Sequence, residues 1–366
     1  MSSPTAEGAG CEPSYYPSLL AVGPHGTLYL SERVWFQGGG GCVRPATGSY
    51  VIVKRTRTGF TSVIAGETAK QGRPIPGRAT ASPLWEEPDA GAVDSDGNLY
   101  VLDDDAVLKI TPGGRLSVVA GELGKSGRPT PGEATQSRFY DPTAIAVDGN
   151  HILYIADSYN DVVEKVTPQG QLSILAGQVR TDSPPIPGPA SQSTLGSPDA
   201  LAVDEAGDVY VASGAGNETV GRYISEISPQ GTLSVVAGDG SWGVPTQGVQ
   251  AVDSPLDAVW GMAIGRSRPL YLVTTTNFSA ASVFALSASG TVTHVAGSVY
   301  GRSKPTGLPA ACGRLEGGYS HWSVLPLQFD SAGNAYMDAD ANSVDGCVVE
   351  VTPQGKLSVL ARTYTK

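Results

Sequence analysis

Residues 140–178, YDPTAIAVDGNHILYIADSYNDVVEKVTPQGQLSILAGQ, contain four short apolar runs separated by turn residues. The runs cover residues 144–147, 153–156, 162–166 and 172–176. Each run is bounded by Asp, Gly, Asn or Pro, which favour turns. The stretch therefore predicts four short strands in one antiparallel meander. Because such a sheet cannot bury both of its faces alone, it needs similar sheets to pack against.

The same pattern recurs along the chain and supplies those neighbours. The second run of each copy has a tyrosine at the same position, namely Tyr29, Tyr100, Tyr154, Tyr210, Tyr271 and Tyr336. The turn before the fourth run has a glycine in each copy, namely Gly59, Gly114, Gly170, Gly231, Gly290 and Gly355. Radial repetition of such sheets predicts an all-β fold, a six-bladed β-propeller of four-stranded antiparallel blades.

The repeat accounts for nearly the whole chain, which favours one closed domain over two. We expect an N-terminal tail over residues 1–13 and a single propeller over residues 14–366. The expected blades are residues 14–67, 85–122, 140–178, 196–240, 253–298 and 320–363. The 47 glycines and 27 prolines, and the absence of long helical periodicity, agree with an all-β fold.

The repeat resembles that of the NHL propellers. Residues 142–170, PTAIAVDGNHILYIADSYNDVVEKVTPQG, match the NHL pattern nearly throughout, and Gly- and Pro-rich links such as residues 65–79 are similar to NHL links. The resemblance covers residues 14–366. It implies the six-bladed fold but chooses no function, since the family includes binding modules, sensor domains and enzymes. Blade five departs from the pattern, with Gly265 and Thr274 where the repeat has Asp.

Charge and composition exclude some partners. The formal net charge is −11 and the sequence pI is near 4.8, with the basic residues scattered. Binding to a nucleic-acid backbone needs clustered Lys and Arg, so we expect no nucleic-acid partner. No apolar stretch is long enough to cross a bilayer, so we expect no membrane insertion. A protein, peptide, glycan or small molecule remains as the partner.

Four cysteines occupy equivalent positions in two repeats. Cys11 and Cys42 flank the first half of blade one, and Cys312 and Cys347 do so in blade six. Four cysteines allow three connectivities, and repeat symmetry favours Cys11–Cys42 and Cys312–Cys347. Such bridges predict an oxidising, extracellular or periplasmic location. The alternative is four reduced, buried thiols.

The first residues, MSSPTAEGAGCEPS, lack the apolar core of a signal peptide. If the protein is exported, we expect a leader to have been replaced by Met1. The alternative is an intracellular protein.

The long insertions all fall on one face of the predicted ring, which we call the top face. It is formed by the links between blades and by the loops between second and third strands. Insertions on one face mark the binding side of repeat proteins. Residues 33–49 are predicted to form a long loop with Trp35 and Phe36 as binding residues. Alternatively, these aromatic residues cover the propeller locally.

Further candidate binding residues lie near the mouth of the central channel, where the inner strands begin. They are Asp89, Tyr140, Asp199, Asp257, Trp260 and Trp322. Converging carboxylates suit calcium, which takes oxygen ligands, so calcium is a candidate cofactor, although no metal ligand set is assigned. The alternative is that these acids form only local hydrogen bonds. Asp103 and Asp157, after the second strands, are expected to accept hydrogen bonds from loop N–H groups.

One histidine, His321, lies near the predicted mouth beside Trp322. An imidazole titrates near neutral pH, so His321 is a candidate general base. Two functions remain open. The first is an extracytoplasmic propeller that binds a protein, peptide or glycan through its top face. The alternative is a hydrolase, lyase or cyclase with its site at the channel mouth.

Overall fold

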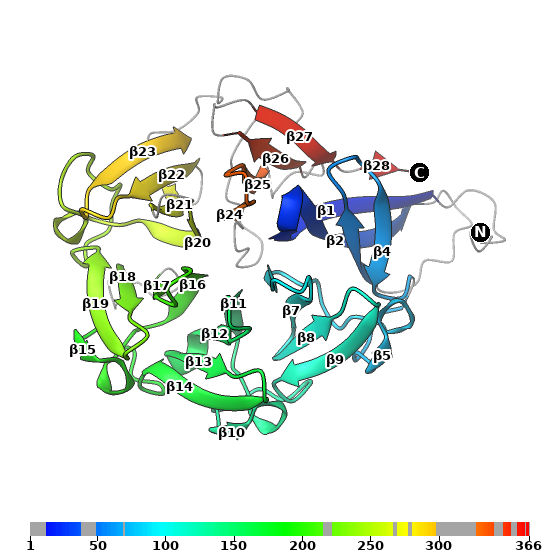
Figure 1. Cartoon of the computed structure of the whole chain (residues 1–366), viewed down its shortest axis with the longest axis horizontal. Coiled ribbons are helices and arrows are strands. Elements are labelled where there is room, and N and C mark those ends of the chain that lie inside the picture. Colours follow the sequence, from blue (N-terminus) through cyan, green and yellow to red (C-terminus); the bar gives the residue numbers. More distant parts are fainter. Residues whose placement is uncertain are drawn as a thin grey trace.

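Six antiparallel sheets are arranged around a central axis, as a computed structural model of the chain shows (Figure 1). The structure describes residues 12–37, 49–68, 70–214, 222–265, 269–276, 280–297, 327–339, 347–352, 357–362 and 364–365. The four main strands of each sheet follow one another along the chain, and the first of these four lies nearest the axis. The predicted all-β, six-bladed propeller is therefore confirmed.

Blades one to three follow the expected order of strands from the axis outward. Blade one has β1 (Glu12–Gly23), β2 (Thr27–Gln37), β3 (Ser49–Arg55) and β4 (Thr61–Ala65). Blade two has β6 (Gly91–Val93), β7 (Leu99–Asp103), β8 (Ala106–Ile110) and β9 (Arg115–Ala120). Blade three has β11 (Pro142–Val147), β12 (Leu153–Asp157), β13 (Val162–Val166) and β14 (Gln171–Gly177).

Blades four to six repeat this arrangement. Blade four has β16 (Pro198–Val203), β17 (Val209–Ser213), β18 (Tyr223–Ile227) and β19 (Thr232–Ala237). Blade five has β20 (Ala258–Ile264), β21 (Leu270–Thr276), β22 (Ala280–Leu286) and β23 (Val292–Gly297). Blade six has β24 (Leu327–Phe329), β25 (Ala335–Ala339), β26 (Cys347–Val351) and β27 (Leu357–Arg362).

The links before blades two, three and four add a fifth strand to each blade's outer edge. These strands are β5 (Gly77–Arg78), β10 (Gly132–Glu133) and β15 (Gly188–Pro189). They pair with β9, β14 and β19. Each is followed by a single 3₁₀ turn, η2 (Ala79–Ala81), η3 (Ala134–Gln136) or η5 (Ala190–Gln192). The links therefore protect edges that would otherwise offer unpaired backbone groups.

The repeated tyrosine is explained by the turn that precedes it. In blade two the Tyr100 hydroxyl donates to Asp94 at 3.1 Å, and Asp94 also accepts the Asn98 N–H at 2.9 Å. Blades three and six repeat the tyrosine contact, at 3.3 Å for Tyr154 and 2.9 Å for Tyr336. The Asp therefore holds the turn and satisfies the buried hydroxyl together.

Blade five shows how the repeat changes when this Asp is lost. Gly265 replaces the Asp, and a Cβ atom built on Gly265 would lie 2.6 Å from Cε2 of Tyr271. Blade one is similar, since a Cβ on Gly23 would lie 3.0 Å from the Tyr29 ring. In both blades the tyrosine ring occupies space next to the turn, so the position needs a glycine.

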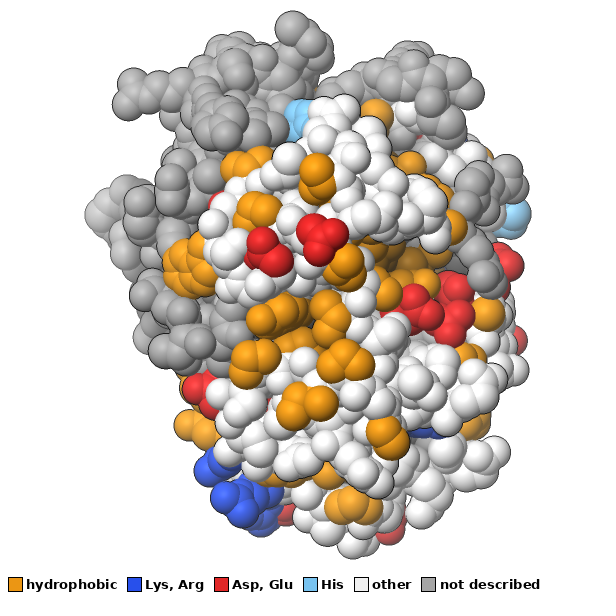
Figure 2. Space-filling model, turned by 90° about the vertical axis from the view of Figure 1, so that its left-hand side faces the viewer, with side chains coloured by type: hydrophobic (Ala, Val, Ile, Leu, Met, Phe, Trp, Pro, Cys, Tyr) orange, Lys and Arg blue, Asp and Glu red, His pale blue; other side chains and the backbone are white. Residues whose placement is uncertain are grey.

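The hydrophobic core lies between neighbouring blades. Between blades two and three, Tyr100 and Leu102 pack with Phe139, Ile155 and other buried residues. Similar clusters join the other blades. Among the described residues, no helix is long and apolar enough to cross a membrane. On the side of the ring seen in Figure 2, the largest basic group lies at the lower left, and the largest acidic groups lie higher on the surface.

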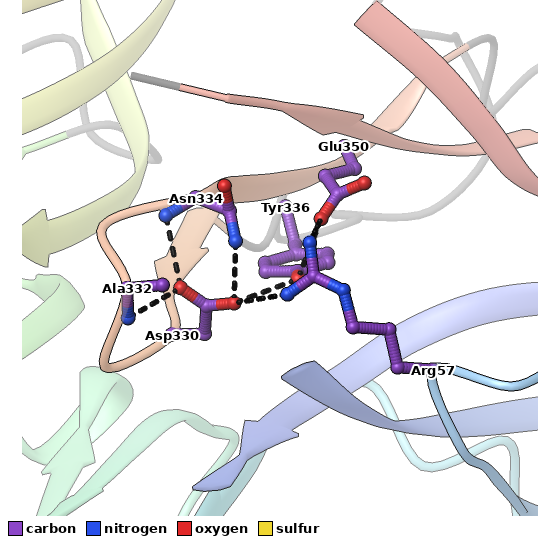
Figure 3. A network of polar contacts seen from close by, with 6 residues as sticks. All are labelled: Arg57, Asp330, Ala332, Asn334, Tyr336 and Glu350. Atoms are coloured by element: carbon purple, nitrogen blue, oxygen red, sulfur yellow. Dashed lines mark hydrogen bonds and ion pairs between the residues drawn. The ribbon is translucent and has the colours of Figure 1, made fainter. Parts of the chain in front are cut away.

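The ring closes between blades one and six through strand pairing and polar contacts. The last strand, β28 (Tyr364–Thr365), pairs with β1 at Ser14 and Tyr15. On the face opposite the top face, Arg57 donates to Asp330 at 3.4 Å and to Glu350 at 3.0 Å (Figure 3). The Tyr336 hydroxyl lies between the same two carboxylates. We call these four residues the closing network.

One expectation about blade one is wrong. Residues 33–37 do not belong to a loop, because β2 continues to Gln37 and pairs with β1 back to Glu12. Trp35 and Phe36 therefore lie in a strand, opposite Ser14 and Pro13. The aromatic and branched residues on both strands favour this extension of the hairpin. The prediction of a loop gave more weight to the glycine run that follows Gln37.

Candidate functional site

The top face between blades two and three is ordered by two buried aspartates. Asp103, at the end of β7, accepts the Trp85 and Glu86 N–H groups, each at 3.0 Å. Asp157, at the end of β12, accepts the Tyr140 N–H at 2.7 Å. Both contacts confirm the expected role of these acids. They fix the segments from which the inner strands of the two blades begin.

Two exposed tyrosines form an aromatic pair on this face. The rings of Tyr140 and Tyr159 lie 5.0 Å apart, and the two residues are 39% and 54% exposed. Tyr159 belongs to the 3₁₀ turn η4 (Ser158–Asn160), and its N–H donates to the Tyr140 carbonyl at 3.1 Å. The guanidinium of Arg180 lies 5.2 Å from the centre of the Tyr140 ring. We call Tyr140 and Tyr159 the tyrosine pair.

Carboxylates gather beside the tyrosine pair. Burial, followed by the negative charges of Glu87, Glu86 and Asp141, raises the pKa of Asp89 to about 7. Water reaches the Asp89 side chain, yet protein atoms crowd it closely enough to disfavour its charged form. Burial also raises the pKa of Glu87, although Arg33 opposes this shift. Glu86, Glu87, Asp89 and Asp141 are called the mouth acids, because the charges of the other three all act on Asp89.

Asp105, on the loop after β7, connects blade two to Asp141 at the start of blade three. It accepts a hydrogen bond from the Asp141 N–H, and burial and the charge of Asp104 raise the pKa of Asp105 to about 6. The loop after β7 is thereby tied to the first residues of blade three. The face therefore concentrates negative charge where two blades meet.

The backbone is strained around the same site. Five non-glycine residues on these loops have positive φ angles, namely Asp104 (58°), Asp141 (55°), Asp161 (57°), Arg180 (58°) and Asp182 (42°). Asp tolerates this conformation better than most residues, but Arg does not. Such strain persists only where the surroundings enforce it, and it gathers at functional sites.

The other predicted binding residues whose side chains the structure describes belong to blades four and five. Asp199 is buried in β16, and Trp260 is half-buried in β20. Asp257 accepts the neighbouring Ala258 N–H at 2.9 Å and lies 3.6 Å from Arg222, which stacks 4.2 Å from the Trp242 ring. The structure therefore brings Asp89 and Tyr140 into one region and assigns Asp257 a local ion pair.

Several expectations fall outside the described residues. His321, Trp322, Cys11, Cys42 and Cys312 are among them. For Trp35, Phe36 and Cys347 only the backbone is described. The candidate general base, the binding role of these aromatic residues and the two disulfides therefore stay predictions.

One group of possible metal ligands occurs within the described part of the chain, on the face opposite the tyrosine pair. Asp94, Asp96 and His151 lie close together, with His151 Nδ1 3.2 Å from Asp94. Asp94 already accepts hydrogen bonds from Asn98 and Tyr100. His151 thus links blade three to the turn of blade two, on the face opposite the channel mouth where calcium is a candidate.

Sequence reasoning missed Tyr159 and Arg180 at this site, and it also missed Glu164, which is fully buried in β13 of the same blade. Tyr159 lies in a turn and Arg180 in a link between blades. In such segments the sequence has no hydrophobic periodicity that would indicate which residues meet. Glu164 did leave a signal, because the equivalent positions in other repeats are uncharged, as at Leu108 and Phe284.

Comparisons with known proteins match the repeats. The family model of the teneurin NHL domain matches residues 76–250. Teneurin-3 of Mus musculus is 30% identical over 173 residues, which is 44% of this chain and 6% of teneurin-3. Teneurin-4 of Mus musculus is 27% identical over 243 residues, 58% of this chain and 8% of teneurin-4. The chain thus matches only a small part of these relatives.

Matches to solved structures have low sequence identity and TM-scores below 0.5. Virginiamycin B lyase from Staphylococcus aureus has a TM-score of 0.48 at 13% identity, covering 94% of this chain and 84% of the lyase. A gluconolactonase from Xanthomonas campestris has a TM-score of 0.45 at 13% identity, covering 92% and 96%. Neither likeness bears on function. Taken together, the six repeats and the closed ring show a six-bladed β-propeller, and its residues 76–250 are similar to the teneurin NHL domain.

Proposed function

We propose that this propeller is a binding module that holds a Lys- and Arg-rich segment of a protein partner on the top face between blades two and three. One observation carries the proposal: the exposed tyrosine pair adjoins the mouth acids through Asp141, which follows Tyr140 in the chain and acts on Asp89. Aromatic rings attract cations through their faces, and carboxylates pair with Lys and Arg. The combination favours a cationic segment over an acidic one.

The setting of the tyrosine pair supports a role in binding. Exposed aromatic residues in loops anchored on a rigid scaffold are typical of binding surfaces. Backbone hydrogen bonds hold both tyrosines in place, so their backbone loses little conformational entropy when a partner binds. The net charge of −11 also favours encounter with a basic partner.

An extracytoplasmic location is part of this proposal. It is supported by the paired cysteine positions in blades one and six. The chain matches only a small part of the teneurins, so their whole-protein properties are not carried over.

A peptide-binding measurement tests the proposal. Fluorescent decapeptides of alternating Lys and Ser, and of alternating Glu and Ser, are titrated with the protein at low and high salt. We expect the Lys peptide to bind at low salt, to weaken at high salt, and the Glu peptide not to bind. Tyr159→Ala should weaken binding about two- to fivefold, the effect of an exposed cation–π contact of about 0.5–1 kcal/mol.

Phe60→Ala is the matched control, since Phe60 is 68% exposed and lies in the turn before β4, away from the tyrosine pair. It should leave the affinity unchanged. Equal weakening by both variants, or equal binding of both peptides, would refute a site at the tyrosine pair.

A second candidate function rests on Asp89. Its pKa of about 7 and its access to water suit a general base at the channel mouth. A hydrolase or lyase of this kind should lose activity on Asp89→Asn, whereas a binding module should keep its peptide affinity within a few-fold. Screening for ester and lactone hydrolysis with the Asp89→Asn variant separates the two.

A further inference from the structure

Two carboxyl groups are buried together beneath the tyrosine pair. Asp157 in β12 and Glu164 in β13 are both 0% exposed. Glu164 lies opposite Ile155 in the strand pair, and directly opposed residues share a face of the sheet. Ile155 packs against Tyr100 and Leu102 of blade two. Glu164 therefore lies in the apolar interface between blades two and three.

The two acids differ in how their oxygens are satisfied. Asp157 accepts the Tyr140 N–H and the Asn160 side-chain amide, each at 2.7 Å. Apart from Asp157 and its own backbone N–H, Glu164 has no hydrogen-bond donor among the described residues at either oxygen. The group that acts on it most strongly is Asp157. A buried carboxylate without donors is costly, so the pair needs a proton between its members.

Glu164 is exceptional among the repeats. The strand pairing gives the equivalent residues directly, because each lies opposite the residue after the repeated tyrosine. They are Val53, Leu108, Ser225, Phe284 and Val349. None of these is ionisable, so the fold itself does not require an acid at this position.

The charges around the pair do not neutralise it. Asp105, on the loop after β7, is the charged group of blade two that acts on Asp157. From blade three itself the neighbours are the neutral Asn160 and the Tyr140 backbone. Burial raises the pKa of Asp157 to about 7 and that of Glu164 well above its usual value. Because the nearby charged group, Asp105, is itself an acid, it disfavours full ionisation of the pair, as does the repulsion between Asp157 and Glu164.

Asp157 connects the buried pair to the surface. The side-chain amide of its partner Asn160 also donates to the Gly127 carbonyl at 2.7 Å. The backbone carbonyl of Asn160 accepts the backbone N–H of Arg180 at 2.9 Å. Asp157 also fixes the Tyr140 backbone. Movement of Asp157 would therefore displace the tyrosine pair and Arg180 together.

We propose that Asp157 and Glu164 share one proton that locks the binding face, and that loss of this proton at alkaline pH loosens Tyr140 and the η4 turn. This regulation rests on the function proposed above, because it acts on the same face. Protonated, the pair forms a hydrogen bond inside an apolar interface. Doubly ionised, it places two negative charges there and pushes Asp157 away from its partners.

Hydrogen exchange of the full chain measures the lock without any partner. The protection factor, which removes the intrinsic pH dependence of exchange, is followed for the Tyr140 and η4 amides from pH 6 to pH 8.5. In the wild type we expect protection to fall at least roughly tenfold over this range. Glu164→Gln keeps the shape and supplies an N–H donor to Asp157, so its protection should stay constant.

Glu164→Leu, which copies Leu108 of blade two, provides a second variant and should also abolish the pH dependence. Glu205→Gln, in an exposed turn of blade four, is the control and should behave as the wild type. The proposal is overturned if wild-type protection stays constant, or if Glu164→Gln and Glu164→Leu lose protection as the wild type does.

The two proposals can fail separately. If exchange shows the lock but the Lys peptide does not bind, the buried switch stands and the partner class is wrong. If the peptide binds equally at pH 6 and pH 8.5 while protection is constant, the binding face stands and the switch is wrong.

Discussion

Removing Arg57 should loosen the ring at the junction of blades one and six. Arg57 stands where other repeats have proline, at Pro112, Pro168 and Pro229. Arg57→Pro therefore restores the turn residue of the repeat while deleting the side chain that reaches blade six. Arg57→Ala removes the same contacts without the proline.

The size of the loss follows from the exposure of the partners. Exposed ion pairs contribute about 0.2–1 kcal/mol, and hydrogen bonds to charged groups about 1.5–3 kcal/mol. The Arg57 side chain is 53% exposed, but those of Asp330 and Glu350 are only 1% and 10% exposed. We expect a loss of about 1–1.5 kcal/mol, because Asp330 keeps its bonds from Asn334 and Tyr336 and is not left unpaired.

Urea unfolding followed by tryptophan fluorescence gives the change in the free energy of unfolding, and hydrogen exchange shows where the ring loosens. Tyr336→Phe, which removes the hydroxyl shared by both carboxylates, should cost about 1–3 kcal/mol. The double variant should deviate from additivity by about 0.5 kcal/mol or more. Arg115→Ala, an exposed residue of blade two, is the control.

The pH dependence gives an independent check. Although burial opposes it, hydrogen bonds from Asn334 and Tyr336 hold the pKa of Asp330 below its usual value. A lowered carboxyl pKa stabilises the fold above the unfolded pKa, about 3.9, and this stabilisation is lost as pH falls through the folded pKa. The Arg57→Ala loss should be constant from pH 6 to pH 8 and shrink below about pH 4. Unchanged stability at pH 7, or loosening spread evenly over all blades, would refute a closing role.

Three further predictions concern the buried acids, the turn of blade five and the cysteines. Asp103, Asp157 and Asp338 have pKa values raised to about 7 by burial, so the folded state holds more protons than the unfolded state between about pH 4 and pH 7; the melting temperature should be higher at pH 5.5 than at pH 8, and the reverse order would contradict these shifts. Gly265→Ala should destabilise by about 1–3 kcal/mol through the clash with Tyr271, whereas Gly149→Ala, with nothing within 4 Å of the added Cβ, should be nearly neutral in the same urea titration. A non-reducing peptide map should show Cys11 linked to Cys42 and Cys312 linked to Cys347, and reduction should lower the free energy of unfolding by about 2–4 kcal/mol. A link between Cys11 and Cys347 would instead indicate a bridge across the junction of blades one and six.

The sequence alone determined the fold, because a repeat is visible without any structure. Aligned positions such as Tyr100 and Tyr154 indicated how many sheets the chain forms, and the turn glycines, among them Gly170 with a φ of 77°, marked where each outer strand begins. Asp103 and Asp157 were also interpreted correctly, since an acid just after a strand accepts nearby N–H groups.

The tertiary structure decided what lies side by side on the top face and across the closing junction. Tyr159 and Arg180 meet Tyr140 only when a turn and a link fold over the same blade, and Arg57 meets Asp330 only when the ring closes. Local pattern specifies turns and strands because these depend on near neighbours. Contacts between loops and between the first and last blades depend on the geometry of the whole ring, which no single repeat encodes.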